Sequence, residues 1–367
     1  MTPHQYRCWV EIDRSALRHN AGLIRARLGP KIEIIAVVKA NAYGHGLTGC
    51  AEALGDHVDY FGVANVEEAM TLRNAVKHPI IILGPALPQE RAAIAGAGFI
   101  PSISTWEEAE DFSRIAPATG VAINFKIDSG MGRMGSLARD AVALFRRVVA
   151  LPNITIHSVS THLPVSNEDP TFTREQLRNF ASLVTQLRRE VPGVYKVHAL
   201  QTAGLLAFGQ ESFDIVRPGI LLYGISPLPE FQRELRPVMT WKTRVVLVRD
   251  MPAGHGISYG RTFLTSRPVR VATLAAGYAD GYPRHLSNTG ASLLVRGRRC
   301  PLLGRVTMDL MMIDVSDVPD VELGDEVVLM GRQDDEEISC AELAERAGTI
   351  TWEITTRIGS RVRGAFV

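Results

Sequence analysis

Short apolar runs rich in valine and isoleucine alternate with amphipathic stretches along the first part of the chain. Helical patterns such as VEEAMTLRNAV, TWEEAEDFSRIA and TREQLRNFASLVTQLRRE separate these runs. The runs themselves, interpreted as strands, cover residues 32–39, 60–64, 79–84, 99–104, 121–128, 154–162, 195–201 and 213–217. Eight strands that alternate with helices favour a closed (β/α)8 barrel of the TIM type over an open, doubly wound sheet.

The pattern changes beyond about Pro237. There, short β-branched runs such as WKTRVVLVRD, VRVATLAAG, ASLLVRG and EVVLMG are separated by glycine, proline and aspartate. One helical pattern, SCAELAERAG, interrupts these runs, and the acidic QDDEE segment is typical of a solvated turn. Because 367 residues can also form two cores, we expect a (β/α)8 domain over residues 1–236 and a mostly β domain over residues 237–367.

Composition and charge narrow the class of protein. Lysine and arginine number 40 against 39 acidic residues, and the formal charge of +1 gives no field that would attract nucleic acid or an anionic membrane. The four cysteines form no Cys-x-x-Cys pair and suggest neither a disulfide framework nor a metal site. No stretch has the length and apolarity of a signal peptide or a membrane span. We therefore expect a cytoplasmic protein with a small-molecule partner.

The segment IIAVVKANAYGHG places Lys39 where a buried strand ends and a loop begins. Active sites of barrels lie at this end of the strands, and a desolvated lysine has the lowered pKa that Schiff-base chemistry needs. Gly44 and Gly46 allow close approach of the backbone, and Tyr43 can offer a hydroxyl to an anion. A lysine that only extends from a strand end to solvent is the alternative.

A second polar segment is NFKIDSGMGRMG, residues 124–135. Alternation along a strand places Asn124, Lys126 and Asp128 on one face, which we expect to be the barrel interior. Buried charges require partners, so this face is either a structural ion-pair network or a binding site. Arg133 follows in a glycine-rich loop, where its guanidinium could hold a carboxylate or pair with Asp128.

Further polar residues occur at the ends of the later strands: His162, Gln201, Thr202 and Arg217. Phosphate sites of barrels often follow the seventh and eighth strands, so the Thr202 hydroxyl and the backbone N–H groups of Gly219 and Ile220 are candidate phosphate ligands. Taken singly, a histidine at a strand end is more often a core residue and an Arg-Pro-Gly segment more often a turn.

The second domain carries tyrosines and methionines in three glycine-containing segments. GISYGRTF contains Tyr259, AAGYADGYPR contains Tyr278 and Tyr282, and GRVTMDLMMID contains Met308. Their composition alone fits amphipathic interface residues and core methionines.

Seven segments, in this order and across nearly the whole chain, resemble the alanine racemase family: AVVKANAYGHG, KIDSGMGRMG, STHL, VRPGILLYG, GISYG, GYADGYPR and GRVTMD. The resemblance implies a racemase that depends on pyridoxal 5'-phosphate (PLP) and has a barrel followed by a β domain. It also implies a head-to-tail homodimer in which the second domain completes the partner's active site. The implied reaction interconverts L-alanine and D-alanine, for peptidoglycan synthesis or for catabolism.

The resemblance also implies roles for single residues. Lys39 would hold PLP as a Schiff base and accept the proton on one face of the substrate, and Tyr259 of the partner subunit would act on the other face. Arg133 and the Met308 backbone would bind the substrate carboxylate, with Lys126, often carbamylated in the family, orienting Arg133. The implied cofactor ligands are Tyr43, Thr202, Gly219 and Ile220 at the phosphate, His162 near the ring and Arg217 at the pyridine nitrogen, and Tyr278 is the implied gate.

Two positions depart from the family's usual pattern. Trp352 stands where the family usually has the tyrosine of a C-terminal YE motif, which removes a hydroxyl donor, and Thr202 stands where serine is frequent. Because free tyrosine has a pKa of about 10, we hypothesise that His162 and Arg217 help Tyr259 to act as a base. The alternatives are a broader racemase of small amino acids such as serine, and a non-catalytic PLP-binding barrel protein, which would generally lack the β domain.

Overall fold

The computed structural model describes residues 5–193 and 195–367. These residues form two compact units. The barrel unit comprises residues 17–42 and 47–236, and the β unit comprises the described residues up to Ala16, Tyr43–Gly46 and Pro237–Val367. The sequence-based division assigns all of residues 1–236 to the barrel. The structure instead groups two short segments of that range with the β unit, because the first strand of the chain pairs with β strands there.

Eight parallel strands close the barrel, as the sequence pattern predicted. In the order of the ring they are β2 (Glu33–Val37), β3 (Tyr60–Val63), β4 (Ile80–Ile82), β5 (Ile100–Ile103), β6 (Val121–Asp128), β8 (Ile154–Ser160), β9 (Lys196–Gln201) and β10 (Ile215–Arg217). The pairing of β5 with β6 joins the two halves of the ring. The short β7 (Ser136–Leu137) adds to β6 outside the ring.

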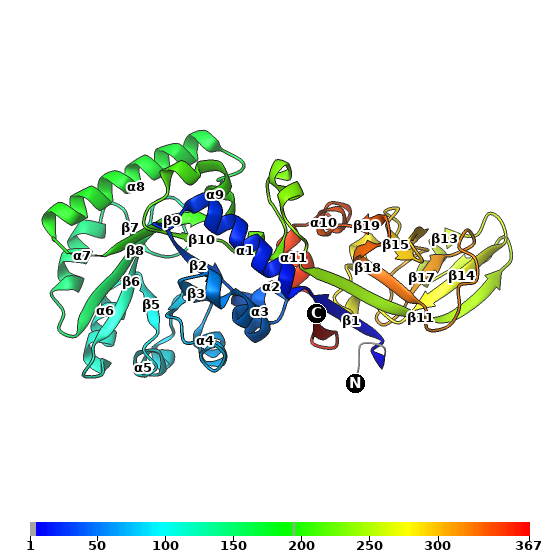
Figure 1. Cartoon of the computed structure of the whole chain (residues 1–367), viewed down its shortest axis with the longest axis horizontal. Helices are drawn as coiled ribbons and strands as arrows, with labels where there is room; N and C mark the ends of the chain where they lie inside the picture. Colours follow the sequence, from blue (N-terminus) through cyan, green and yellow to red (C-terminus); the bar gives the residue numbers. More distant parts are fainter. Residues whose placement is uncertain (1–4, 194) are drawn as a thin grey trace. The chain divides into compact units, whose positions relative to one another are not determined.

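Helices surround the strands of the barrel (Figure 1). They are α1 (Arg14–Leu28), α2 (Lys39–Tyr43), α3 (Leu47–Leu54), α4 (Val66–Arg73), α5 (Arg91–Gly96), α6 (Trp106–Ile115), α7 (Ala141–Val149), α8 (Pro170–Glu190) and α9 (Thr202–Phe208). The side chains of Asn65, Thr105 and Asp169 accept backbone N–H groups at the starts of α4, α6 and α8. These caps satisfy N–H groups that have no partner within the helix.

Part of the barrel core is a cluster of branched apolar side chains. Ile35, Ile81, Ile100 and Ile215 pack together with Tyr60 in one buried cluster. Parallel strands covered by helices are buried on both faces and are therefore rich in branched apolar residues. The polar residues that follow in the same strands form the candidate site.

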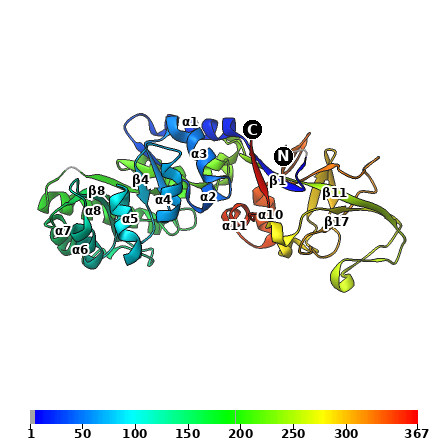
Figure 2. The same cartoon turned by 90° about the horizontal axis from the view of Figure 1, so that it is seen from below.

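The β unit is built on a mixed sheet with the strand order β16, β15, β18, β11, β1 and β20, and β14 and β17 extend it from β11 (Figure 2). Its strands are β1 (Cys8–Ile12), β11 (Met239–Met251), β12 (Gly256–Ile257), β13 (Phe263–Leu264), β14 (Val269–Leu274), β15 (Ser292–Val295), β16 (Arg298–Pro301), β17 (Met311–Asp314), β18 (Glu326–Gln333), β19 (Glu336–Ile338) and β20 (Arg363–Phe366). Helices α10 (Cys340–Ala347) and α11 (Thr351–Thr356) pack against each other. Within the QDDEE segment, which the sequence pattern predicted as a turn, only Asp334 and Asp335 form the turn; Gln333 ends β18, and Glu336 and Glu337 belong to β19, which pairs with β18.

Other features of the two described ranges can be stated briefly. None of their helices has the length and apolarity needed to cross a membrane. Their cysteines, Cys8, Cys50, Cys300 and Cys340, form no disulfide bonds and are buried. Within the same ranges, no group of three histidine, cysteine or acidic side chains is placed to hold a metal ion.

Candidate active site at the strand ends of the barrel

Lys39 lies two residues after Val37, the last residue of β2, and is half-buried. Burial lowers its pKa, and the positive charge of Arg133 lowers it further, against the opposing effect of Glu68. The Glu68 carboxylate accepts the N–H groups of Ala40 (2.7 Å) and Ala64 (2.9 Å), so it fixes the backbone that follows Lys39. A lysine with a lowered pKa is more often an uncharged amine, which is the nucleophilic form.

The backbone after Lys39 makes a left-handed turn. Ala40, Asn41, Ala42 and Tyr43 all have φ between 52° and 54°. This conformation costs about 1–2 kcal/mol for each residue with a side chain, and such strain is typical of functional sites. Asn41 supports the turn because its Oδ1 accepts the Leu47 N–H at 2.9 Å. Tyr43, the last residue of α2, is buried, and burial raises the pKa of its phenol.

Strand β6 has the predicted alternation. Asn124 and Lys126 are buried polar residues, and Phe125 and Ile127 are buried between them on the other face, where Phe125 packs edge-on against the Phe145 ring. Burial lowers the pKa of Lys126 well below its usual value, and Arg217 and Arg133 lower it further. The Lys126 amine is therefore favoured in its uncharged form.

Asp128 organises the loop that carries Arg133. Its Oδ1 accepts the N–H groups of Gly130 and Met131, both at 2.9 Å. Burial opposes ionisation of Asp128, but the backbone N–H groups of this loop outweigh it and lower the pKa of the carboxyl. Arg133, five residues after Asp128, is exposed. The guanidinium of Arg133 is thus available to an anionic ligand.

Arg217, at the end of β10, is buried and holds several acceptors in place. Its Nη2 donates to the carbonyl oxygens of Thr161 and Ala199, both at 2.8 Å, and lies 3.4 Å from His162 Nδ1. Its Nη1 donates to His198 Nδ1. Burial lowers the pKa of Arg217 to about 10, which leaves it protonated at neutral pH. Burial, together with nearby cations led by Arg217, lowers the pKa of His162 to about 2, so its ring is neutral.

A one-way chain of hydrogen bonds continues from His198 through the barrel interior. Because the guanidinium can only donate, His198 Nδ1 accepts and Nε2 carries the ring proton, 3.2 Å from Ser158 Oγ. Ser158 then donates to Asn124 Oδ1 and Asn124 Nδ2 to Ser102 Oγ, both at 3.0 Å. Ser102 donates to the Ile82 carbonyl at 2.7 Å. We call these residues the serine–asparagine chain; it satisfies buried polar groups and fixes the tautomer of His198.

The phosphate candidates lie after β9 and β10, as predicted from their strand-end positions. Thr202 is the first residue of α9, and its Oγ1 accepts the Gly219 N–H at 3.0 Å. A threonine hydroxyl that accepts one hydrogen bond can still donate its own proton. Ile220 opens the short 3-10 helix η5 (Ile220–Tyr223). In this structure the Gly219 N–H is therefore directed to Thr202, while the Thr202 hydroxyl can donate to an anion.

In the β unit, backbone hydrogen bonds join the segment of Tyr278 to the segment of Met308. Tyr278 N–H donates to the Thr307 carbonyl and Ala279 N–H to the Met308 carbonyl, both at 3.0 Å. Gly277 is required there, because a Cβ would lie 2.3 Å from each of these carbonyl oxygens. Met308 is 53% exposed and Tyr278 is 39% exposed.

Tyr259 follows a serine that is hydrogen-bonded to the segment leading to Met308. It opens the 3-10 helix η7 (Tyr259–Arg261), and its ring is 71% exposed. The preceding Ser258 donates from Oγ to the Arg305 carbonyl at 2.6 Å, in the segment that leads to Met308. Ser258 itself has φ of 64°, an uncommon conformation for a residue with a side chain. The tyrosine is thus held by its backbone and presented to solvent.

Sequence reasoning missed two residues of the barrel site. Glu68 was not identified as a site residue because it follows the capping Asn65 by three residues, a position that helix capping alone explains. His198 stood in a strand without a motif, although strand alternation places it on the same face as Leu200 and away from Val197. Trp352, the departure noted in the sequence, lies in α11 and is half-buried.

Lys39, Lys126, Arg133 and Arg217 thus give one end of the barrel a concentration of basic groups, with neutral His162 beside them. Such an arrangement suits an anionic ligand, and Lys39 adds a nucleophile. The fold and the site define a (β/α)8-barrel enzyme with an appended β domain and a lysine at its catalytic strand end.

Comparison with known proteins identifies the family. The model of the alanine racemase N-terminal domain matches residues 12–227, and that of the alanine racemase C-terminal domain matches residues 238–366. The alanine racemase of Halothermothrix orenii is 42% identical over 96% of this chain and 95% of its own length. That of Methylacidiphilum infernorum is 40% identical over 98% of this chain and 93% of its own.

Solved structures agree with this result. Alanine racemase from Bacillus anthracis with bound L-Ala-P superposes with a TM-score of 0.91 at 34% identity, over 100% of this chain and 96% of that one. Alanine racemase from Bartonella henselae with covalently bound pyridoxal phosphate gives a TM-score of 0.88 at 27% identity, over 99% and 100%. The chain belongs to the alanine racemase family.

Proposed function

We propose that this chain interconverts L-alanine and D-alanine with pyridoxal 5'-phosphate as its cofactor. The observation that carries the proposal is Lys39, a half-buried amine with a lowered pKa at the catalytic end of β2. The match to alanine racemases along nearly the whole chain supports both the reaction and the substrate. The basic groups around Lys39 suit a cofactor and a substrate that are both anionic.

The residues at the strand ends of the barrel, together with Tyr43, fit PLP. Lys39 would hold the cofactor covalently, and the Thr202 hydroxyl, with the backbone at Gly219 and Ile220, would bind its phosphate, with Tyr43 as a further donor. Arg217 stays protonated and would face the pyridine nitrogen as a donor, near the neutral ring of His162. Bound PLP supplies an electron sink that stabilises negative charge at the substrate Cα.

Proton transfer needs one group on each face of Cα. Lys39 removes or returns the proton on one face, and Tyr259 of the partner subunit does so on the other. Removal of a proton by a tyrosine requires its phenolate, which nearby cations such as Arg217 would stabilise. Because Arg217 stays protonated at neutral pH, it would donate to the pyridine nitrogen without protonating it, and so would limit side reactions that need a stronger electron sink.

The substrate carboxylate would be held by Arg133 and by the Met308 backbone. Arg133 is exposed on the loop after β6, and Lys126, whose pKa burial and neighbouring cations lower, would orient its guanidinium. Tyr278 would narrow the entrance for small substrates. Exposure of Tyr259, Tyr278 and Met308 on the β unit supports a homodimer, since a second subunit would bury them.

The test measures both cofactor and product. Wild type, Lys39→Ala and the exposed control Lys77→Ala are purified with PLP, and absorbance spectra and D-alanine formation from L-alanine are recorded. We expect Lys39→Ala to lose the lysine-bound absorbance and at least about a thousandfold in racemisation, whereas Lys77→Ala behaves as wild type. Full activity of Lys39→Ala would overturn the proposal.

Side-chain preference is tested with the same preparations. Turnover of L-serine is compared with that of L-alanine, and we expect alanine to have the higher kcat/KM. A preference for serine would replace alanine racemisation with a broader activity. A protein that binds PLP but leaves L-alanine optically unchanged would be a non-catalytic carrier.

A further inference from the structure

The loop that follows β6 and carries Arg133, residues 129–135, is rich in glycine; we call it the Arg133 loop. It contains three glycines, and Gly130 and Gly135 have φ of 144° and 111°, which residues with side chains rarely adopt. Glycine loses more conformational freedom on folding than any other residue. Contacts from outside the loop must therefore add to those of Asp128 if Arg133 is to be held in one position.

Gln176, in the second turn of α8, makes such a contact. It is buried, with 3% of its surface exposed, and its Nε2 donates to Ser129 Oγ at 2.9 Å and to the His162 carbonyl at 3.0 Å. A side-chain amide has two N–H donors, so both are used. One side chain therefore joins the Arg133 loop to the strand end that carries His162.

Hydroxyl groups join the same two strand ends a second time. Ser129 Oγ lies 2.5 Å from Thr161 Oγ1, and the carbonyl of the fully buried Thr161 accepts Arg217 Nη2 at 2.8 Å. Gln176 is thus part of a set of hydrogen bonds that connects the ends of β6, β8 and β10. Candidate site residues lie at all three of these strand ends.

The start of α8 is itself fixed beside the Arg133 loop. Asp169 Oδ1 accepts the Phe172 N–H at 3.0 Å, and Pro170 begins the helix. A Cβ at Gly130 would lie 3.2 Å from Phe172 Cζ and 3.5 Å from Gln176 Nε2. The helix and the loop therefore pack directly against each other, and Gln176 donates from a fixed position.

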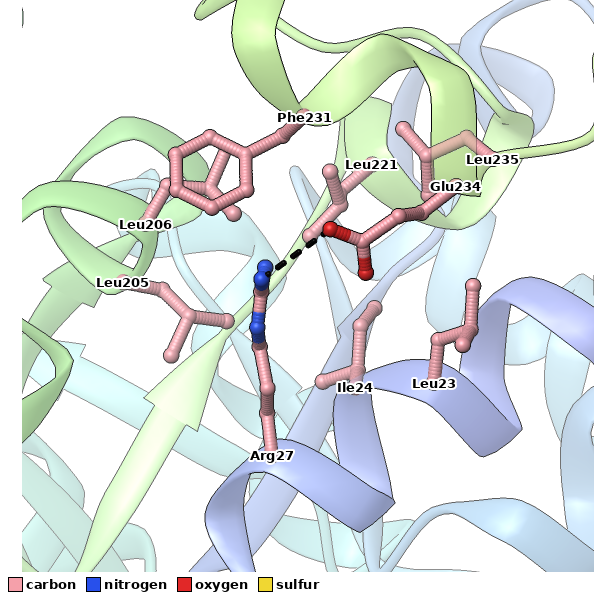
Figure 3. A pocket seen from close by; sticks show the side chains of 9 residues that line it. All are labelled: Leu23, Ile24, Arg27, Leu205, Leu206, Leu221, Phe231, Glu234 and Leu235. Atoms are coloured by element: carbon pink, nitrogen blue, oxygen red, sulfur yellow. Dashed lines mark hydrogen bonds and ion pairs between the residues drawn. The ribbon is translucent and has the colours of Figure 1, made fainter.

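The pocket that Figure 3 shows takes no part in this arrangement. Its walls come from α1, α9, η5 and the 3-10 helix η6 (Pro229–Glu234), and its two charged groups, Arg27 and Glu234, pair with each other at 3.3 Å. Both of these side chains are about half exposed, so their ion pair contributes little to stability. The hydrogen bonds of Gln176 are buried, and their loss would leave polar groups without partners.

We propose that Gln176 is a positioning residue for the substrate carboxylate. By its bonds to Ser129 and to the His162 carbonyl, it holds the Arg133 loop so that the guanidinium meets the carboxylate without first having to be ordered. Gln176 acts only through this loop. The inference rests on the proposed function, in which Arg133 binds that carboxylate.

Steady-state kinetics of the PLP-loaded protein test the proposal. Gln176→Leu occupies a similar volume but removes both donors. Because Arg133 would hold the carboxylate both before and during the reaction, we expect the KM for L-alanine to rise about tenfold and kcat to change less than about threefold. Gln186→Leu is the matched control, since Gln186 lies on the same helix, is exposed and donates from Nε2 to Glu190 Oε1 at 2.9 Å. Its KM should equal that of wild type.

Ser129→Ala tests the same connection from the loop side, and it also serves if Gln176→Leu does not fold. Its KM should rise as well. In the double variant the two effects should not multiply, because both substitutions break the same connection. Full multiplication of the two effects would mean that Gln176 and Ser129 act separately, and would contradict the proposal.

Two fragments of alanine separate the carboxylate from the amino group. Propionate lacks the amino group and should inhibit about tenfold more weakly in Gln176→Leu than in wild type. Ethylamine lacks the carboxylate, and its reaction with lysine-bound PLP, followed by absorbance, should be the same in both proteins. Unchanged KM and unchanged inhibition by propionate in the Gln176 and Ser129 variants would overturn the proposal, whatever their stability.

Hydrogen exchange separates the inference from the proposed function, because it needs neither substrate nor turnover. The backbone of residues 129–135 should exchange at least about threefold faster in Gln176→Leu than in wild type or Gln186→Leu. An unchanged rate would show that Gln176 does not order the loop and would overturn the proposal, even in an active enzyme. A wild type that does not racemise alanine would instead overturn the proposed function, and the carboxylate role with it.

Discussion

The candidate residues of the barrel unit and those of the β unit are held in opposite ways. Arg217 and His198 are buried and hydrogen-bonded to groups of their own unit, down to the carbonyl of Ile82. Tyr259 and Met308 are more than half exposed; a backbone hydrogen bond holds Met308, and the side chain of the preceding Ser258 holds the segment of Tyr259. The barrel residues thus have their orientation fixed before any ligand binds, whereas the β-unit residues need a further surface to become a desolvated site.

This difference explains why the partners of the barrel residues are found within a single unit, whereas those of the exposed β-unit residues are not. Buried polar groups must be satisfied locally, because an unpaired one costs about 1–3 kcal/mol. Exposed aromatic residues have no such requirement, and under the proposed function a second subunit would cover them. Substitutions in the β unit should therefore lower enzyme activity. Substitutions in the barrel interior should instead lower the free energy of unfolding.

The largest effect is expected at Tyr259. Tyr259→Phe keeps the ring but removes the hydroxyl, and loss of one acid–base group lowers kcat by about a hundredfold to ten-thousandfold. Stability should stay within about 0.5 kcal/mol of wild type, because the side chain is exposed. D-alanine formation and urea unfolding measure the two quantities.

A mixed dimer tests whether the β unit acts on a second subunit. Lys39→Ala and Tyr259→Phe chains carrying different tags are co-expressed, and the mixed dimer is isolated through both tags. If Tyr259 serves the partner's site, one site contains both substitutions and the other contains neither, so about half of the wild-type activity returns. A mixed dimer as inactive as its two parents would place both residues in one chain's site.

Asn124 should show the opposite behaviour. Asn124→Ala removes the acceptor of the Ser158 hydroxyl and the donor to Ser102, so the free energy of unfolding should fall by about 2–4 kcal/mol. Arg217 keeps its two carbonyl acceptors, and kcat should change by less than about tenfold. Exposed Asn74→Ala is the control, and urea unfolding is the measurement. A loss below about 0.5 kcal/mol would show that the serine–asparagine chain does not form.

Features that depend on local sequence pattern could be predicted, whereas contacts that depend on how the strands are aligned could not. The strands of the barrel were predicted within a few residues, because branched apolar runs between capped helices leave few other folds. Lys39 and Arg133 could be named as candidates because each ends a predicted strand or follows one, and their roles stay predictions. The partnership of Arg217 with His198 could not be predicted, because it depends on the register between β9 and β10, which includes an irregularity.

The left-handed turn after Lys39 was not predicted either. KANAY contains no glycine, and alanine favours right-handed helices, so local propensity opposes the observed backbone. The constraint comes from tertiary contacts, such as the Glu68 carboxylate on the Ala40 N–H and Asn41 on the Leu47 N–H. Strain of this kind indicates that the fold holds Lys39 in place at a cost in stability.

An alanine-to-glycine substitution at each of two positions tests this backbone strain. The expected changes in the free energy of unfolding are the smallest of the effects predicted here. Ala40→Gly relieves a left-handed residue that costs about 1–2 kcal/mol, and the greater entropy of the unfolded chain offsets about 0.4–1 kcal/mol of the gain. The net result should be a rise of about 0.5 kcal/mol in the free energy of unfolding. Ala26→Gly, at an exposed position inside α1, should instead lower it by about 1 kcal/mol. The Ala40 N–H that donates to Glu68 is kept in the glycine variant, so the difference in sign reports backbone conformation alone. Equal losses at both positions in urea unfolding would mean that Ala40 is not left-handed in solution, and that the barrel end is not strained around Lys39.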